Sequence, residues 1–277
     1  MELNRNYFLS LYQRIIHDEL YNSETNLVIN PFSVIKKDIL NSETLNKIKV
    51  ELSIRFQNEG FVLINFDKSF SNKEILEWAI STLVGIPISD SANQGKQYSK
   101  IFAEVDAKFY ANTHYAQPPH TDDAHVPTTP RFISLFCERQ AAQGGITILV
   151  KFESIYNELS HLNNQDLASL FHSDAITING ANGILKRPFF YKLNDGLKGL
   201  VFPAFVNSLF AEKKIITTFL KIAELILNLK YQIRIKLKSR QFLLLDNYRI
   251  LHGRTGFKIE DDRLLYRFCF NKVFNCH

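Results

Sequence analysis

The 277-residue sequence has few of the residues that stabilise small secreted domains or build structural metal modules. Its three cysteines, Cys137, Cys269 and Cys276, are odd in number and irregularly spaced. This pattern excludes a disulfide framework and a zinc ribbon. It is typical of a reducing compartment. Cys137 lies in the apolar run 132–137, so it is expected to be a small buried side chain.

Long hydrophobic segments are also missing. No apolar run is long enough to cross a bilayer. Near the N-terminus, Glu2, Arg5 and Arg14 are among the charges that interrupt any signal-peptide core. With the cysteine usage, this predicts a cytoplasmic protein without a membrane partner.

The sequence has no strong excess of charge of one sign. Its formal net charge is +5, and basic and acidic residues are interspersed. The densest basic stretch, 230–240, alternates with Ile233, Ile235 and Leu237, which predicts a strand with one solvated face. An RNA or DNA contact is the minor alternative. We therefore expect a small-molecule partner and no nucleic acid, and the sequence leaves the oligomeric state open.

What the sequence does contain is a large apolar content. Hydrophobic residues make up 45% and aromatic residues 13%, including 23 phenylalanines, which is typical of a globular protein. No repeat, low-complexity tract or linker divides the chain. We predict one domain over 1–277, with a mostly helical part, 1–95, packed on a core formed by 96–277.

Local patterns support this division. Apolar residues at helical spacing between Leu45 and Phe56 precede Gly60, where a helix would stop. Residues 61–66 form a short apolar run that predicts a strand. Residues 71–74 have the form of a capping box and introduce a second helical pattern.

From about residue 98 the sequence consists of short strand-like runs separated by turn residues. The predicted strands are 101–105, 132–137, 146–150, 175–178, 200–205, 231–238, 242–245 and 264–270. Two helices are expected, one within about 151–172 and one over about 208–229. The fold class is therefore mainly β with flanking helices (α+β), and the core is expected to be a sandwich or jelly-roll barrel.

A candidate metal site lies within this β region. His120 and Asp122 are two residues apart, so on an extended segment they point to the same face. His252 follows a buried strand far downstream. A His-x-Asp pair alone is weak evidence. Two imidazoles and one carboxylate, however, leave three positions of an octahedral ion open, an arrangement that suits Fe(II), a chelating co-substrate and O2.

A second cluster indicates the co-substrate. A strand over 263–270 would place Arg263 and Arg267 on one face within an apolar run. A guanidinium matches a carboxylate in bidentate geometry, so a dicarboxylate such as 2-oxoglutarate can bind iron at one end and an arginine at the other. Thr147 can add a hydroxyl. The alternative is that both arginines are exposed beside Asp261 and Asp262.

Several residues near these motifs keep two interpretations. Asn112, Tyr115 and Gln117 can bind polar groups of a substrate or serve as loop hydrogen-bond partners. His114 and His125 are expected to line the pocket or the surface, and Asp123 is the less favoured carboxylate ligand. Asp246 and Asn247 are expected to turn the chain and to orient His252. The aromatic segments 187–190 and 202–205 either shape the pocket or belong to the core.

Together these motifs resemble those of the taurine dioxygenase and clavaminate synthase group of Fe(II)/2-oxoglutarate oxygenases. The resemblance covers about 59–270 and rests on Glu59–Leu63, Leu83–Pro87, Pro119–Asp122, Gly144–Thr147, Asp246–Phe257 and Asp262–Arg267. The metal segments are specific and the N-terminal ones weak.

The resemblance implies a double-stranded β-helix of the cupin-like jelly-roll type, with iron held by His120, Asp122 and His252. It implies that Thr147 and Arg263 bind the distal carboxylate of 2-oxoglutarate. Arg267 would support that carboxylate or meet an acidic group of the substrate. Asp122 is present where some halogenating relatives have a small residue, which favours hydroxylation or desaturation.

The implied reaction consumes 2-oxoglutarate and O2 and releases succinate and CO2. The expected substrate is a small amino acid or an amino-acid-derived metabolite of secondary metabolism, free or carrier-bound. Two other hypotheses remain: a catalytically silent barrel that binds or regulates, and a zinc-dependent hydrolase on the same barrel.

Overall fold

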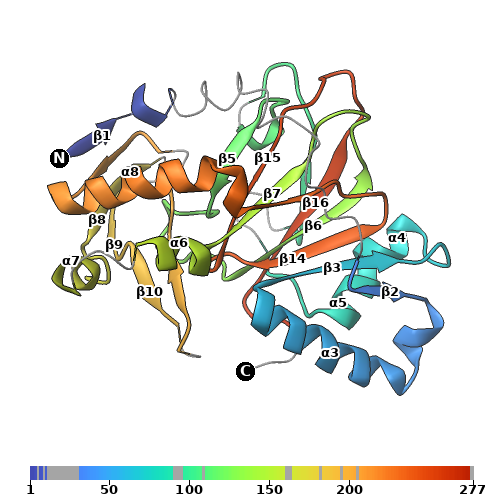
Figure 1. The fold of residues 1–277 in the computed structure, drawn as a ribbon. Helices are drawn as coiled ribbons and strands as arrows, with labels where there is room; N and C mark the ends of the chain where they lie inside the picture. The colour runs from blue at the N-terminus through green and yellow to red at the C-terminus, as the bar shows by residue number, and fades with distance from the viewer. Residues whose placement is uncertain are drawn as a thin grey trace.

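Two β-sheets form the centre of the computed structural model (Figure 1). The structure describes residues 1–4, 6–8, 10, 31–89, 96–107, 110–159, 164–180, 183–193, 196–203 and 206–274. The larger sheet has the order β2 (Ser33–Ile35), β3 (Phe61–Phe66), β14 (Gln241–Asp246), β6 (Phe132–Arg139), β16 (Leu264–Phe270) and β4 (Ser99–Ile101). The smaller sheet has the order β13 (Gln232–Ile235), β7 (Thr147–Lys151), β15 (Ile250–Arg254) and β5 (Gln117–His120).

Alternation along the strands explains how the larger sheet is buried on both faces. Leu243 and Leu245 of β14 belong to an apolar cluster that also contains Leu149 and Ile250 of the smaller sheet. Phe242 and Leu244 point to the opposite face, since successive side chains of a strand alternate. The predicted jelly-roll core therefore has one apolar layer between the sheets and another outside the larger sheet.

Helices from the N-terminal part cover this outer face. Helix α3 (Thr44–Glu59) ends at Gly60, whose φ of 77° gives the left-handed C-cap that the sequence predicts. Ser71 and Glu74 form the predicted capping box before α4 (Asn72–Glu74), a π-helical turn (Ile75–Ala79) and α5 (Ile80–Leu83). A 3-10 turn (Asp38–Asn41) precedes α3.

The N-terminal part also contributes strands. Strands β2 and β3 lie within the larger sheet, and β1 (Glu2–Asn4) pairs with β12 (Ser208–Phe210). The N-terminal part thus contributes strands to the β-sheets in addition to the helices that pack on the larger sheet. The assignment of one domain with a change of character at residue 95 stays a prediction, because 90–95 lie outside the described residues.

A third layer covers the far side of the smaller sheet. It contains a sheet of order β1, β12, β8 (Ile176–Gly180) and β9 (Gly183–Arg187), and the ribbon of β10 (Phe190–Lys192) and β11 (Lys198–Leu200). Helices α6 (Phe152–Glu158), α7 (Asn164–Ser169) and α8 (Lys213–Leu227) pack with them around one aromatic-rich cluster. Short 3-10 turns occupy Tyr110–Asn112 and Leu229–Tyr231.

Some predicted boundaries were wrong. The helix expected from about 208 begins at Lys213, because 208–210 pair as strand β12 between β1 and β8. The strand expected over 200–205 ends at Leu200, residues 201–203 are irregular, and 204–205 lie outside the described residues. The strand expected over 101–105 is β4, which ends at Ile101. The predicted helix within 151–172 is two helices, α6 and α7.

The solvated face predicted for 230–240 was wrong in its first half, although Lys238 is exposed and Lys236 half-buried as predicted. Arg234 is only 1% exposed and Gln232 is buried. Gln232 Nε2 donates to the carbonyl of Ile226 in the last turn of α8 at 2.9 Å, so at this residue the polar side of the strand contacts α8 and not solvent. An alternating pattern on one strand does not show what packs over its polar side.

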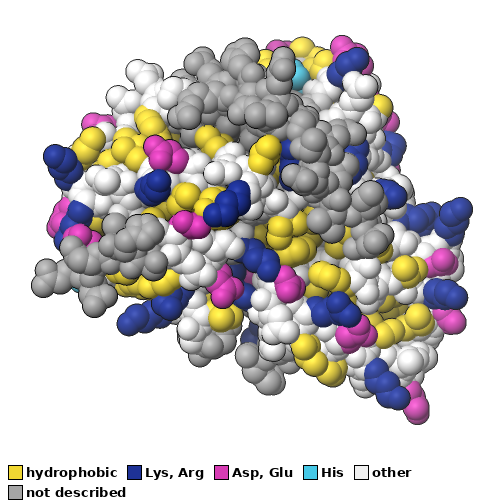
Figure 2. Space-filling model, viewed as in Figure 1, with side chains coloured by type: hydrophobic (Ala, Val, Ile, Leu, Met, Phe, Trp, Pro, Cys, Tyr) yellow, Lys and Arg dark blue, Asp and Glu magenta, His cyan; other side chains and the backbone are white. Residues whose placement is uncertain are grey.

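Other expectations agree with the structure. Cys137 is buried, while Cys276 lies outside the described residues. Within the described ranges, no helix combines the length and apolarity that a membrane crossing requires. On the face shown in Figure 2, Lys and Arg side chains are interspersed with Asp and Glu.

Candidate metal centre

The two histidines of the candidate site are cross-strand neighbours in the smaller sheet. His252 of β15 pairs directly with His120 of β5, and their ring centroids are 4.8 Å apart. Gly253 allows the two strands to approach, since a Cβ there would lie 2.5 Å from the carbonyl oxygen of Gln117. Sheet pairing therefore joins two ligands that are distant in sequence.

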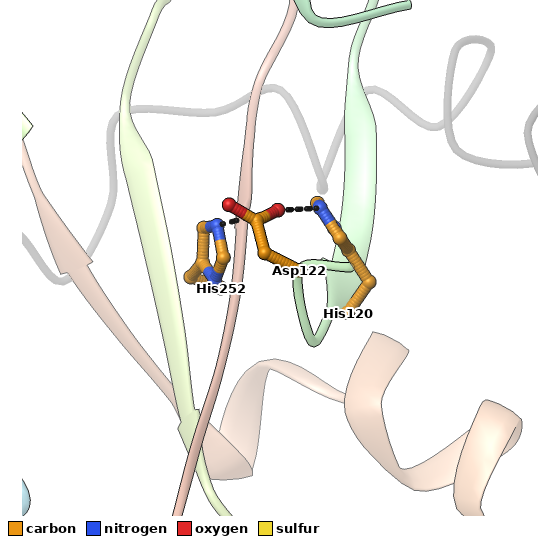
Figure 3. A group of neighbouring side chains, drawn as sticks. All are labelled: His120, Asp122 and His252. Carbon is orange, nitrogen blue, oxygen red and sulfur yellow. Dashed lines mark ion pairs between the residues drawn. The ribbon is translucent and has the colours of Figure 1, made fainter. Parts of the chain in front are cut away.

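Asp122 completes the cluster from the turn after β5. Its Oδ1 lies 3.3 Å from Nε2 of His120 and 3.6 Å from Nε2 of His252, and the three side chains point toward one another (Figure 3). Within the described residues, they form the group whose donor atoms, all within 4.8 Å, suit a metal ion. Asp123, with φ of 55°, does not join it.

The surroundings of the two imidazoles are compatible with metal binding. The carbonyl of Pro118 lies 2.8 Å from Nδ1 of His120, so this bond needs the proton on Nδ1 and leaves the Nε2 lone pair for an ion. Burial is the main cause that lowers the pKa of His252 to about 4. Burial opposes ionisation of Asp122, but the charge of Arg267 and the two imidazoles outweigh it and lower the carboxyl pKa.

Two residues hold the Asp122 carboxylate and its backbone. Arg267 Nη1 donates to Asp122 Oδ2 at 2.7 Å, which leaves Oδ1 directed at the imidazoles. The fully buried side chain of Asn247 accepts from Asp122 N at 2.9 Å and donates to the carbonyls of Asp122 and Pro130. Asn247 thus clamps the metal-binding turn through three hydrogen bonds.

Asp246 and Asn247 turn the chain as predicted, but their other predicted role, to orient His252, differs from what the structure shows. The described contacts of their side chains are with Asp122, Pro130, Arg131 and the following turn, and none is with His252. The turn after β14 lies beside the chain that follows His120. No local sequence pattern predicts this contact, because the partners of Asn247 are 117 to 125 residues away.

Arg187 is a further residue that sequence reasoning did not identify. Its guanidinium donates to the carbonyls of Ala124 and Val126, to Thr129 Oγ1 and to the Tyr191 hydroxyl. These bonds hold the chain that leaves the metal ligand Asp122. Arg187 is therefore part of the site's framework, whereas the sequence only placed it beside a possible aromatic pocket wall.

The cluster opens into a cavity of about 440 Å³ between the two sheets. Thr147 and Arg263 line it, and so do the metal-binding side chains and Arg267. Thr147 Oγ1 and Arg263 Nη1 are buried and have no hydrogen-bond partner among the described residues. Burial lowers the pKa of Arg263 to about 10, so it stays charged near neutrality. Two polar groups thus lie in the cavity without the partners that buried groups require.

The predicted substrate-side residues have mixed positions. Asn112 and Gln117 both line the cavity, but the amide of Asn112 donates to Glu104 at 3.3 Å and that of Gln117 to the carbonyl of Tyr110 at 3.0 Å. His125 lines the cavity. His114 instead lies against the ring of Tyr115, with centroids 4.2 Å apart.

The aromatic segments divide in the same way. Pro203 lines the cavity, while Phe189, Phe190 and Phe202 belong to the apolar cluster around α8. For these three phenylalanines, the core interpretation was the right one.

A jelly-roll fold whose cavity is lined by two imidazoles and one carboxylate is typical of non-haem Fe(II) oxygenases. A family model described as "Taurine catabolism dioxygenase TauD, TfdA family" matches residues 51–269. The chain belongs to this family, which confirms the family, fold class and enzyme class that the sequence motifs indicated. No curated protein matches the chain.

Solved structures with the same fold include an asparagine oxygenase in complex with Fe(II), 3-hydroxyasparagine and succinate. It has a TM-score of 0.67 and 12% identity, and the alignment covers 96% of this chain and 92% of that one. The non-haem iron oxygenase OrfP in complex with Fe and alpha-ketoglutaric acid has a TM-score of 0.62 and 15% identity, with coverage of 87% and 93%. OrfP with Fe, succinate and (3S)-hydroxy-L-Arg scores 0.60 at 15% identity, with coverage of 87% and 94%.

Proposed function

We propose that this protein is an Fe(II)- and 2-oxoglutarate-dependent dioxygenase that oxidises a C–H bond of a small amino acid or an amino-acid-derived metabolite. One observation carries the proposal: the cluster of His120, Asp122 and His252 opens into a cavity that also contains two buried polar groups without described partners. Family membership supports the reaction class.

The donor set fits a ferrous ion. Two neutral imidazole nitrogens and one carboxylate oxygen are the ligands of non-haem Fe(II) oxygenases, which leave open positions for a chelating co-substrate and O2. When bound, iron and 2-oxoglutarate would activate O2, which is the oxidant; 2-oxoglutarate would supply two electrons and leave as succinate and CO2. His120, Asp122 and His252 hold and orient the ion, and Arg267 keeps the second carboxylate oxygen of Asp122 engaged.

The unpartnered groups fit the distal carboxylate of 2-oxoglutarate. Arg263 Nη1 and Thr147 Oγ1 would both donate to it, so that each gains the partner that it lacks. The two arginines then have different tasks. Arg263 anchors the co-substrate, whereas Arg267 pairs with the metal ligand Asp122.

The rest of the cavity is suited to a small polar substrate. A volume of about 440 Å³ is within the range of small-molecule sites. Asn112, Gln117 and His125 add polar lining near the metal cluster. The two similar enzymes described above bind hydroxylated amino acids, which supports an amino-acid-like substrate. Cytoplasmic location and a role in secondary metabolism remain predictions.

An anaerobic titration tests the proposal. Fe(II) together with 2-oxoglutarate should give a weak visible absorption band that neither gives alone, and His120→Ala should lose it. A panel of amino acids should then reveal substrate-dependent succinate formation in air. A wild-type protein that binds Fe(II) but shows neither band nor succinate would support the silent barrel. Hydrolysis that requires Zn(II) would support the hydrolase.

A further inference from the structure

Arg254 is a buried arginine to which neither the sequence motifs nor the proposed function gives a task. It lies on β15 two residues after His252, so both side chains are on the same face of the strand. Arg254 is 5% exposed and lines the cavity. Thr147, on the neighbouring strand β7, is its direct cross-strand partner. Arg254 therefore borders the end of the cavity where Thr147 and Arg263 lie.

The guanidinium of Arg254 holds the chain that precedes the metal-binding strand β5. It donates to the carbonyls of Ala111 at 3.3 Å, of Thr113, and of Tyr115 at 3.4 Å. We call residues 110–116 the wall segment, because Tyr110, Ala111 and Asn112 line the cavity. Arg254 thus borders the part of the cavity where we place 2-oxoglutarate, and it also holds the wall segment, which lines the part where we place the substrate.

The charge of Arg254 is poorly compensated. Its contacts within the described part of the chain are with carbonyl oxygens and the ring of Phe257, and no carboxylate is among them. The guanidinium of Arg263 lies 5.1 Å from the centroid of the same ring, as does that of Arg254. Both cations are buried beside the same ring, so their charges repel each other, and an anion close to both would offset much of this cost.

We propose that Arg254 is a positioning residue that couples occupancy of the co-substrate site to the order of the wall segment. The inference rests on the proposed function, since it takes the anion to be the distal carboxylate of 2-oxoglutarate. That carboxylate offsets the repulsion from Arg263, and the buried Arg254 then holds its carbonyl partners more firmly. By linkage, an ordered wall segment favours co-substrate binding to the same extent.

Amide hydrogen exchange of the full-length protein tests this coupling without turnover. The protein is loaded with Mn(II) under argon, and exchange is followed with and without 2-oxoglutarate. In the wild type, exchange in residues 110–116 should slow about tenfold or more when 2-oxoglutarate binds, the size expected for one strengthened charge-assisted bond. Pyruvate has no distal carboxylate and should not slow it.

Arg254→Gln should remove this response and leave exchange in β3 and β14 unchanged. Arg249→Gln is a matched control, because Arg249 also donates to backbone carbonyls, those of Gln57 and Asn58, but does not line the cavity. It should keep the response. If Arg254→Gln fails to fold, Arg254→Lys serves, since it keeps the charge but has fewer donors and should give a reduced response.

Separate binding measurements distinguish the possible failures. If 2-oxoglutarate does not bind the metal-loaded wild type, the proposed function fails. If it binds but the wall segment does not respond, or if the Arg254 variants respond as the wild type does, the coupling is refuted. In turnover, Arg254→Lys should raise the substrate KM several-fold more than it lowers kcat. An equal effect on both would also refute a positioning role.

Discussion

Replacing Arg263 with glutamine should weaken 2-oxoglutarate binding strongly while leaving the metal site intact. The Arg263 side chain is buried, and its Nη1 has no described partner until the co-substrate arrives. A hydrogen bond to a charged group contributes roughly 1.5–3 kcal/mol. Since about 1.4 kcal/mol corresponds to a factor of ten in affinity, the dissociation constant should rise roughly ten- to hundredfold.

The assay is a titration of anaerobic Fe(II) protein with 2-oxoglutarate, followed by visible absorption and checked by calorimetry. Arg263 Nε also donates to Gln140 Oε1 at 3.0 Å, so thermal unfolding of the variant must be measured alongside. Pyruvate provides the control, because it shares the chelating end of 2-oxoglutarate but has no distal carboxylate. Its affinity should change little.

Two results would refute the reasoning. An unchanged 2-oxoglutarate affinity in Arg263→Gln would move the anchor to another residue, with Arg267 the first candidate. An equal loss of affinity for pyruvate would show that the substitution damages the cavity in general. Arg267→Gln is the complementary variant, since Arg267 contacts Asp122 and should affect the metal first.

Three further predictions concern the residues around the metal ligands. Arg267→Gln should raise the Fe(II) dissociation constant about tenfold, because loss of a residue that hydrogen-bonds to a metal ligand typically weakens metal binding by that factor or more. An unchanged Fe(II) affinity, measured by equilibrium dialysis, would contradict this. Asn247→Ala removes the three hydrogen bonds of a buried side chain and should lower the free energy of unfolding by about 2–4 kcal/mol, so an unchanged denaturant midpoint would argue against the clamp. Gly253→Ala should weaken Fe(II) binding because its Cβ would lie 2.5 Å from the Gln117 carbonyl oxygen. Gly183→Ala is the control for general destabilisation, because its φ of 99° strains an alanine although a Cβ there meets no atom within 4 Å. Equal metal affinities in the two variants would refute the close-approach argument.

The features that the sequence predicted correctly are governed by local physics. Residues 61–66 and 264–270 are strands with the predicted bounds, because their apolar content and flanking residues favour no alternative. Gly60 and the capping box at 71–74 lie where the helix ends were expected. The spacing of His120 and Asp122 correctly predicted that their side chains lie together, although Asp122 belongs to the turn after β5 and not to the strand itself.

The features that the sequence did not reveal depend on partners far along the chain. Asn247, Arg187 and Arg254 all act through hydrogen bonds to backbone carbonyls. Any residue supplies a carbonyl, so such contacts leave no pattern in the sequence. Strands of three residues such as β1 and β12 are too short for a periodic signal, and the burial of Arg234 depends on what packs above its strand.

The pairing of His120 with His252 has a consequence for how the enzyme matures. These histidines are opposite each other only once β5 and β15 have joined, and contacts of such long sequence separation form late in folding. Before that step the chain offers an ion only the His120–Asp122 pair, which is a weak chelate. Iron added during refolding should therefore leave the rate of folding unchanged and instead slow the unfolding of the finished protein.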